Sequence, residues 1–226
     1  MSGVNVFDRN PRFVKPAARE AWQESFQPVL DELRAALQAH PPQRVAELAG
    51  AQWDAAASEL RLCWLDRCYR IAWPDMMVFP IDCEEPALAN VQGLLLYYLD
   101  RADGTPRAEE WISFRELPDG WLYHQAFQGY TGDRLVQALE NDLADFVWRC
   151  KALGGTSMEL GDKGYAFQVL PAVWLAVVYW QGDEEFPAQA HVLFDAAAGH
   201  YLSVDGLAML GSHLVSHLIA VESQNI

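Results

Sequence analysis

The sequence predicts an α+β fold in which an antiparallel sheet, made of a hairpin and a C-terminal meander, is covered by about five helices. Three observations predict it. Hydrophobic residues recur with helical spacing in some segments and alternate in others, in the order helices, hairpin, helices, meander, helix. Turn signals at Gly161, Pro171 and Gly182 separate the C-terminal alternating segments at hairpin distances. The 226 residues are 51% hydrophobic, which is enough to bury a sizeable core.

The chain shows no internal repeat, no low-complexity tract and no obvious linker. We therefore expect residues 15–226 to form a single α+β domain, with a possible subdivision near residue 85. Residues 1–14 are expected to form a flexible N-terminal arm.

Two helices are expected at the start of this domain. The first covers residues 16–38, and Pro28 inside it should kink or restart it. The second is short and runs from Pro42 to Gly50, a typical C-terminal stop. The residues expected to face inward are Trp22, Phe26, Val29, Leu33 and Leu37 in the first helix, and Val45 and Leu48 in the second.

Residues 59–73 alternate as a hairpin. The alternation fits both arms when Cys63 lies opposite Cys68. One face of the hairpin then carries the apolar side chains Leu60, Leu62, Trp64, Tyr69, Ile71 and Trp73.

Residues 92–129 organise the rest of the chain. Their first part, residues 93–99, is apolar on every side, so the helix expected to begin at Pro86 must be buried all round. Asp103-Gly104 ends this helix. The second part is rich in aromatic residues that carry polar groups, and such segments form a core or the wall of a pocket.

A long helix is expected to begin at Thr131 and to end at Gly154. An antiparallel meander follows, with strands near residues 157–160, 165–170, 173–180 and 190–194. Ser203 or Asp205 then caps a closing helix.

The net charge and the lack of a signal peptide or membrane span in the sequence indicate which partners and which compartment to expect. The net charge is −15, from 31 acidic and 16 basic residues, and this disfavours nucleic acid and anionic membranes as partners. The first residues lack the apolar core of a signal peptide and no apolar run is long enough to span a bilayer, so we expect a cytoplasmic protein.

The four cysteines match no common zinc or iron–sulfur spacing. We expect Cys63 and Cys68 to be facing reduced thiols, with a disulfide as the alternative, and we expect no metal at these two residues and Cys83. Cys150 lies on an apolar helical stripe, which is typical of a buried, unreactive thiol.

His213 and His217 are four residues apart on the closing helix and share a face. Leu214 stands where a metalloprotease helix has its catalytic Glu, and the sequence shows no third ligand, so we expect a polar helix edge rather than a metal site. A glycine-rich phosphate loop and a GxSxG nucleophile motif are also absent from the sequence.

The aromatic segment supplies the main candidates for a binding site. Trp111 could stack on a planar ligand, Arg115 could bind a carboxylate or phosphate, and His124 could donate or accept a hydrogen bond. The alternative is that Arg115 pairs with Glu116 or another acid and that His124 completes a hydrogen bond in the core. Asp195 and His200 lie in the connection between a strand and the closing helix, where functional groups are common.

Two runs carry a resemblance to a known family: GLLLYYLDRADGTPRAEEWISFRELPDGWLYHQAFQGYTGDRL and LAVVYWQGDEEFPAQAHVLFDAAAGHYL. They resemble domain-of-unknown-function family 3786 of bacteria and archaea, over most of residues 45–220. The resemblance implies a prokaryotic source but no established activity and no known cofactor. Some members of that family are fused to a cysteine-rich module thought to bind an iron–sulfur cluster, and this chain lacks that module.

Our leading hypothesis is an accessory domain that binds a small ligand or cofactor and serves anaerobic redox or one-carbon metabolism, as the resemblance implies. One alternative is an enzyme with a non-standard site built from Arg115, His124 and Asp195. Another is a protein–protein interaction module whose acidic surface binds a basic partner, with aromatic residues that are all structural.

Overall fold

The computed structural model describes the backbone of residues 16–221 and the side chains of residues 27–221. The predicted arm over residues 1–14, and the side chains of Trp22 and Phe26, lie outside the described residues.

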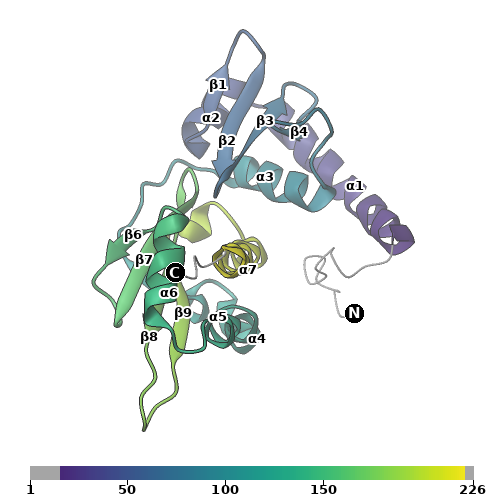
Figure 1. The fold of residues 1–226 in the computed structure, drawn as a ribbon. Coiled ribbons are helices and arrows are strands. Elements are labelled where there is room, and N and C mark those ends of the chain that lie inside the picture. Colours follow the sequence, from purple (N-terminus) through teal and green to yellow (C-terminus); the bar gives the residue numbers. More distant parts are fainter. Residues whose placement is uncertain (1–15, 222–226) are drawn as a thin grey trace. The chain divides into compact units, whose positions relative to one another are not determined.

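The described chain divides into two compact units (Figure 1). The first comprises residues 16–62 and 67–104, and the second comprises residues 63–66 and 105–221. The prediction of a single domain, with a possible subdivision near residue 85, stays a prediction.

The first unit combines a four-stranded antiparallel sheet with three helices. The sheet has the order β1-β2-β3-β4, and its strands are β1 (Gln52–Asp54), β2 (Glu59–Trp64), β3 (Arg67–Ala72) and β4 (Met77–Pro80). The helices are α1 (Pro16–Gln38), α2 (Pro42–Ala49) and α3 (Ala89–Arg101).

The hairpin and the buried helix of this unit were predicted from sequence. β2 and β3 form the hairpin, and its predicted inward residues Leu60, Tyr69 and Ile71 are buried. Helix α3 is buried along most of its length, although it begins at Ala89 rather than at Pro86. The Tyr98 hydroxyl of α3 donates a hydrogen bond to a carbonyl of α2.

One inward residue of α1, Val29, was predicted incorrectly, whereas Leu33 and Leu37 are buried as predicted. Val29 is 48% exposed, and the buried residues are Leu30, Leu33 and Leu37, which follow the three- and four-residue spacing of one helical face. The helix runs through Pro28 without ending there.

The second unit contains a five-stranded antiparallel sheet of order β5-β9-β8-β7-β6. The strands are β5 (Trp111–Ser113), β6 (Thr156–Met158), β7 (Lys163–Leu170), β8 (Val173–Trp180) and β9 (Gln189–Asp195). The helices are α4 (His124–Tyr130), α5 (Gly132–Leu139), α6 (Leu143–Ala152) and α7 (Val204–Ala220), with short 3-10 turns η2 (Phe114–Glu116), η3 (Gly120–Leu122) and η4 (Ala196–His200). The α+β class is confirmed, but the chain builds two separate sheets where one was predicted.

Helices cover one face of this second sheet. The ring of Phe127 in α4 packs on Phe194 of β9, with ring centres 5.7 Å apart. The ring of Phe146 in α6 stacks on Tyr179 of β8 at 5.1 Å. Because side chains alternate along a strand, the neighbours of Phe194 and Tyr179 point to the opposite face.

The long helix predicted from Thr131 is two helices. Glu140 and Asn141 have φ angles of +46° and +68°, a left-handed conformation that ends α5. Asp142 then accepts a hydrogen bond from the backbone N–H of Asp145 and begins α6. Thr131 does not cap α5, because its hydroxyl donates back to the Phe127 carbonyl of α4.

Among the helices of the described residues, none combines the length and the apolar character needed to cross a membrane.

The first testable prediction concerns the close approach of α5 to β9. A Cβ on Gly132 would lie 1.9 Å from the carbonyl oxygen of Ala190, which is backbone and cannot rotate away. We expect Gly132→Ala to lower the free energy of unfolding by about 1–3 kcal/mol, measured by urea denaturation. Gly129→Ala in α4 is the control, because its Cβ would meet nothing within 4 Å. Equal stability of the two variants would contradict this account of the packing.

Candidate functional site

Three side chains form a row across adjacent strands on the face of the second sheet that points away from the helices. Trp111 of β5 pairs directly with Asp195 of β9. Trp174 of β8 lies on the same face, because its neighbour Leu175 pairs with Phe194. The row therefore places Asp195 on the strand that lies between the strands of the two tryptophans.

Arg107 fills the space between the two indole rings. It belongs to the extended segment that precedes β5, and its guanidinium carbon lies 4.2 Å from the centre of the Trp174 ring and 5.3 Å from that of Trp111. Its Nε donates to the Asp195 carboxylate at 3.3 Å. We call Trp111, Trp174 and Asp195 the tryptophan clamp.

Strand spacing explains why a flat cation fits the clamp. Trp111 and Trp174 are two strands apart, which separates their backbones by about 9–10 Å. A flat group in contact with a ring on each side needs about 7–8 Å. The sheet therefore sets a gap that one planar group can fill, and the ring faces favour a positive charge there.

The Asp195 carboxylate is 2% exposed and fully engaged. One oxygen accepts from the backbone N–H groups of Ala108 and Ala197, at 2.9 and 3.0 Å. The other accepts from the backbone N–H of Glu109 at 2.9 Å and from Arg107. With every acceptor site used, this carboxylate is a structural anchor and a counter-ion, and it is poorly suited to act as a general base.

His200 lies close to the same segment. Its Nδ1 is 3.2 Å from the Thr105 hydroxyl, and the Tyr201 hydroxyl donates to the Thr105 carbonyl. Three of the candidates predicted from sequence, Trp111, Asp195 and His200, therefore all meet the segment over residues 105–110.

Arg115 and His124 are placed elsewhere. Arg115 is exposed in η2, and His124 is bonded through Nδ1 to the Trp121 carbonyl, three residues before it. Within residues 27–221, no hydrogen bond or ion pair joins either of them to the clamp. Phe114 and Phe127, from the same aromatic segment, stack in the core with ring centres 4.1 Å apart.

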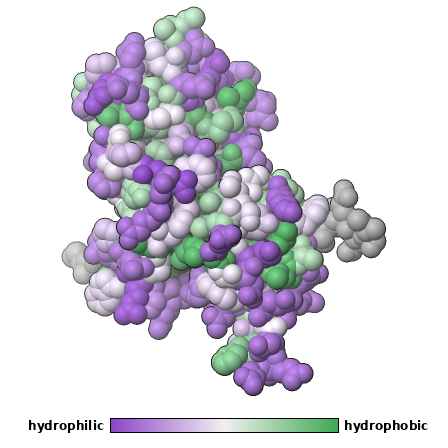
Figure 2. All heavy atoms as spheres, turned by 90° about the vertical axis from the view of Figure 1, so that its left-hand side faces the viewer, coloured by the Kyte–Doolittle hydropathy of each residue, from purple (hydrophilic) through white to green (hydrophobic). Residues whose placement is uncertain are grey.

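Two aromatic side chains of this segment are exposed, since Trp121 and Tyr123 are 62% and 55% exposed. Figure 2 shows one face of the molecule, on which hydrophobic residues are set among hydrophilic ones. The aromatic segment predicted from sequence therefore divides into a buried part and an exposed part.

The cysteines differ from the leading expectation. Cys63 and Cys68 are disulfide-bonded, which was the alternative, while Cys83 and Cys150 are free thiols. Cys150 is buried as predicted, and burial raises the pKa of its thiol. Within the described residues no group of three or more His, Cys, Asp or Glu side chains could hold a metal ion.

The two histidines of α7 make packing contacts. The Nδ1 of His217 donates to the His213 carbonyl at 2.8 Å, and its Nε2 lies 3.5 Å from the Asp66 carboxylate. The ring of His213 lies 4.7 Å from that of Trp64.

Sequence reasoning missed Arg107 and Trp174. Trp174 could have been found, because the alternation of β8 places it on the face opposite Val173 and Leu175. Arg107 carried no local signal, since its partner Asp195 is 88 residues away.

Comparison with known proteins identifies a family. Residues 41–217 match the family described as domain of unknown function (DUF3786), so the chain belongs to that family. The resemblance noted from the sequence is thereby confirmed. No curated protein and no solved structure matches the chain.

A second testable prediction concerns Asp195. Asp195→Asn removes the charge and turns an NH₂ group towards backbone donors, so we expect the free energy of unfolding to fall by about 2–4 kcal/mol. Asp119→Asn is the control, because Asp119 is exposed and has a φ of +64°, which Asn tolerates. Denaturation that leaves both variants as stable as the parent would show that Asp195 is not an anchor.

A third prediction concerns His191, on the same face of β9. Its Nδ1 lies 2.9 Å from the Gln128 side-chain oxygen, and burial lowers the pKa of the ring, opposed by the charge of Asp133. A lowered pKa means that the folded state favours the neutral ring, while the unfolded state binds the proton more readily. Folding stability that depends on this residue is therefore complete above the ordinary pKa of 6.5 and declines as the pH falls below it.

The measurement is the melting temperature of the parent and of His191→Gln between pH 8 and pH 5. We expect the parent to lose more stability than the variant towards acid. Identical pH profiles would contradict the assignment.

Proposed function

We propose that the second unit is a binding module that recognises a flat or quaternary cation, such as a guanidinium or methylated ammonium group, in the tryptophan clamp. The observation that carries this proposal is the position of Arg107, whose guanidinium occupies the clamp as an incoming cation would. Two aromatic faces above a carboxylate are a well-suited arrangement for holding such cations.

Release of Arg107 from the clamp would leave few polar groups without a hydrogen-bond partner. Asp195 would keep its three backbone donors, from Ala108, Glu109 and Ala197. The Arg107 side chain is already 32% exposed, so it can move into water at a modest energetic cost. Exchange of one cation for another at this site therefore conserves its main interactions.

Charge favours a cation over an anion. Glu109 and Glu110 are exposed next to Arg107, so the local charge stays negative even with Arg107 in place. The whole chain carries a net charge of −15, which attracts cations and repels anions at long range. This agrees with the interaction-module hypothesis, in which an acidic surface binds a basic partner.

A second candidate function, the binding of an anion, also depends on Arg107. Within the described residues, the two terminal amino groups of Arg107 have no hydrogen-bond or ion-pair partner, so they could bind a carboxylate stacked beside the tryptophans. This is the small-ligand hypothesis in its most specific form. The enzyme hypothesis has less support, because Asp195 is fully engaged. The expected role in anaerobic redox or one-carbon metabolism stays a prediction.

The test compares the parent with Arg107→Ala in titrations with argininamide, tetramethylammonium and benzoate, followed by indole NMR signals. We expect Arg107→Ala to bind both cations about three- to thirtyfold more tightly, because the competing side chain is gone. A short arginine-containing peptide then distinguishes a protein partner from a free small cation, because only a protein-binding site would favour the peptide over argininamide.

Arg115→Ala is the matched control, since it removes the same charge outside the clamp. Equal affinities of Arg107→Ala and Arg115→Ala for the cations would overturn the proposal. Loss of benzoate binding in Arg107→Ala alone would establish the anion site instead.

A further inference from the structure

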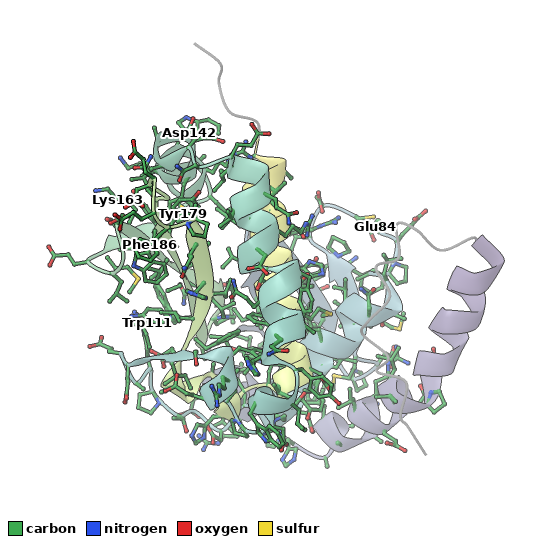
Figure 3. All side chains as sticks on the ribbon, turned by 90° about the horizontal axis from the view of Figure 1, so that it is seen from below. Glu84, Trp111, Asp142, Lys163, Tyr179 and Phe186 are labelled. Carbon is green, nitrogen blue, oxygen red and sulfur yellow. The ribbon has the colours of Figure 1, made fainter. Side chains whose placement is uncertain are left out.

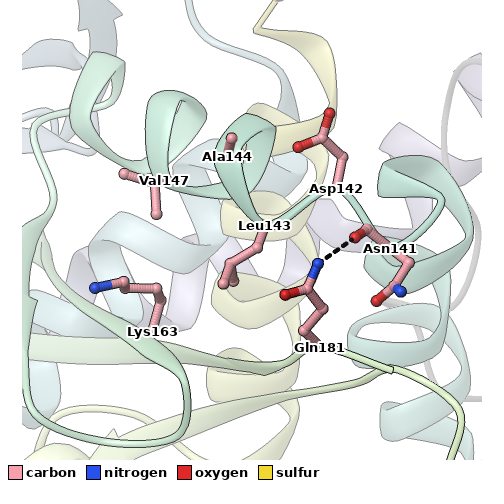
Figure 4. A pocket seen from close by; sticks show the side chains of 7 residues that line it. All are labelled: Asn141, Asp142, Leu143, Ala144, Val147, Lys163 and Gln181. Atoms are coloured by element: carbon pink, nitrogen blue, oxygen red, sulfur yellow. Dashed lines mark hydrogen bonds between the residues drawn. The ribbon is translucent and has the colours of Figure 1, made fainter. Parts of the chain in front are cut away.

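The second unit contains an open pocket of about 620 Å³ that is separate from the tryptophan clamp (Figure 4). It lies where α5 ends and α6 begins, on the helix-covered side of the sheet. Its lining residues are Asn141, Asp142, Leu143, Ala144, Val147, Lys163 and Gln181.

The break between α5 and α6 forms one side of this pocket. The side chain of Asn141 is fixed by two hydrogen bonds to the backbone of Gly182, of 3.0 and 2.7 Å. The Gln181 side chain donates to the Asn141 carbonyl at 3.3 Å, as Figure 4 shows. These contacts join the start of α6 to the end of β8 and hold the pocket in a defined shape.

A buried hydroxyl without a partner lies beside the pocket. Tyr179 is 0% exposed, and within the described residues its hydroxyl has no hydrogen-bond partner. Its strand partner is Lys163, which lines the pocket. The Asn141 backbone lowers the pKa of this hydroxyl and the Asp142 carboxylate raises it, and both residues belong to the lining. Figure 3 shows Asp142, Lys163 and Tyr179 in one region of the unit.

An orphan buried hydroxyl is unfavourable, because it has given up its hydrogen bonds to water. Burial raises the pKa of Tyr179, so the group stays a neutral O–H that can donate.

The remaining lining groups indicate the class of ligand. Within the described residues, Lys163 has no ion-pair partner, whereas Asp142 already accepts from the Asp145 backbone as a helix cap. Leu143 and Val147 offer apolar contact. The volume suits a small organic molecule.

We propose that this pocket binds a small compound with an apolar body and one anionic end. The anionic end pairs with Lys163, and the body lies against Leu143 and Val147. This site is independent of the tryptophan clamp, so either proposal can fail without the other.

The test uses 8-anilinonaphthalene-1-sulfonate, a fused-ring compound with one sulfonate, titrated by fluorescence and located by methyl NMR. We expect shifts of the Leu143 and Val147 methyl signals. Lys163→Gln should weaken binding about three- to fivefold, the effect of losing one partly exposed ion pair. Lys151→Gln is the control, since Lys151 is an exposed lysine in the last turn of the same helix.

Tyr179→Phe tests the buried hydroxyl separately from the Lys163 charge. We expect it to raise the melting temperature of the ligand-free protein by about 2–4 °C, because a buried polar group without a partner is removed, and to leave binding of the probe unchanged, because Tyr179 does not line the pocket. Methyl shifts confined to other parts of the chain, or equal effects of Lys163→Gln and Lys151→Gln, would overturn the proposal.

Discussion

The second unit depends on the hydrogen bonds that the Asp195 carboxylate accepts. Asp195 is the last residue of β9, and its two oxygens hold the extended segment before β5 on one side and the first turn of η4 on the other. A single buried charge therefore fixes where the edge strand enters the sheet and where the chain leaves it towards α7. The position of Arg107 follows from this arrangement, because the anchored segment carries its side chain over the two tryptophans. The clamp therefore forms as a consequence of the hydrogen bonds by which Asp195 holds this segment.

Local patterns in the sequence were enough to predict the fold class and most of its elements. Alternation located β7, β8 and β9, and the apolar run over residues 93–99 correctly indicated a buried helix. The errors fall where the deciding feature is short or non-local. β1 and β5 have three residues each, which is too short for alternation to be recognised. The split between α5 and α6 was missed because Leu135, Leu139 and Leu143 keep helical spacing across it, while the left-handed backbone of Glu140 and Asn141 leaves no mark on that pattern.

The candidate site was predicted only in part, for the same reason. Trp111, Asp195 and His200 were named from residue type and from their place at the ends of elements, and all three meet one segment. Arg115 and His124 were chosen because they are close in sequence to aromatic residues. Proximity along the chain does not bring side chains together, however: Arg115 is exposed on a 3-10 turn, and His124 bonds to a carbonyl at the start of a helix. The decisive pairing of Arg107 with Asp195 spans 88 residues, and a single sequence carries no record of it.

The two left-handed residues between α5 and α6 have an implication for how this fold can vary. Asn141, Asp142 and Leu143 all line the pocket, so the cavity exists because the helix is interrupted at this point. A chain that carried residues with strong helical preference at positions 140 and 141 would favour a continuous helix and would have no cavity there. Within one fold, two backbone positions are thus sufficient to separate members that carry the cavity from members that do not. A change in ligand range between relatives would then appear as a difference in helix length, which is visible before any side chain of the pocket is compared.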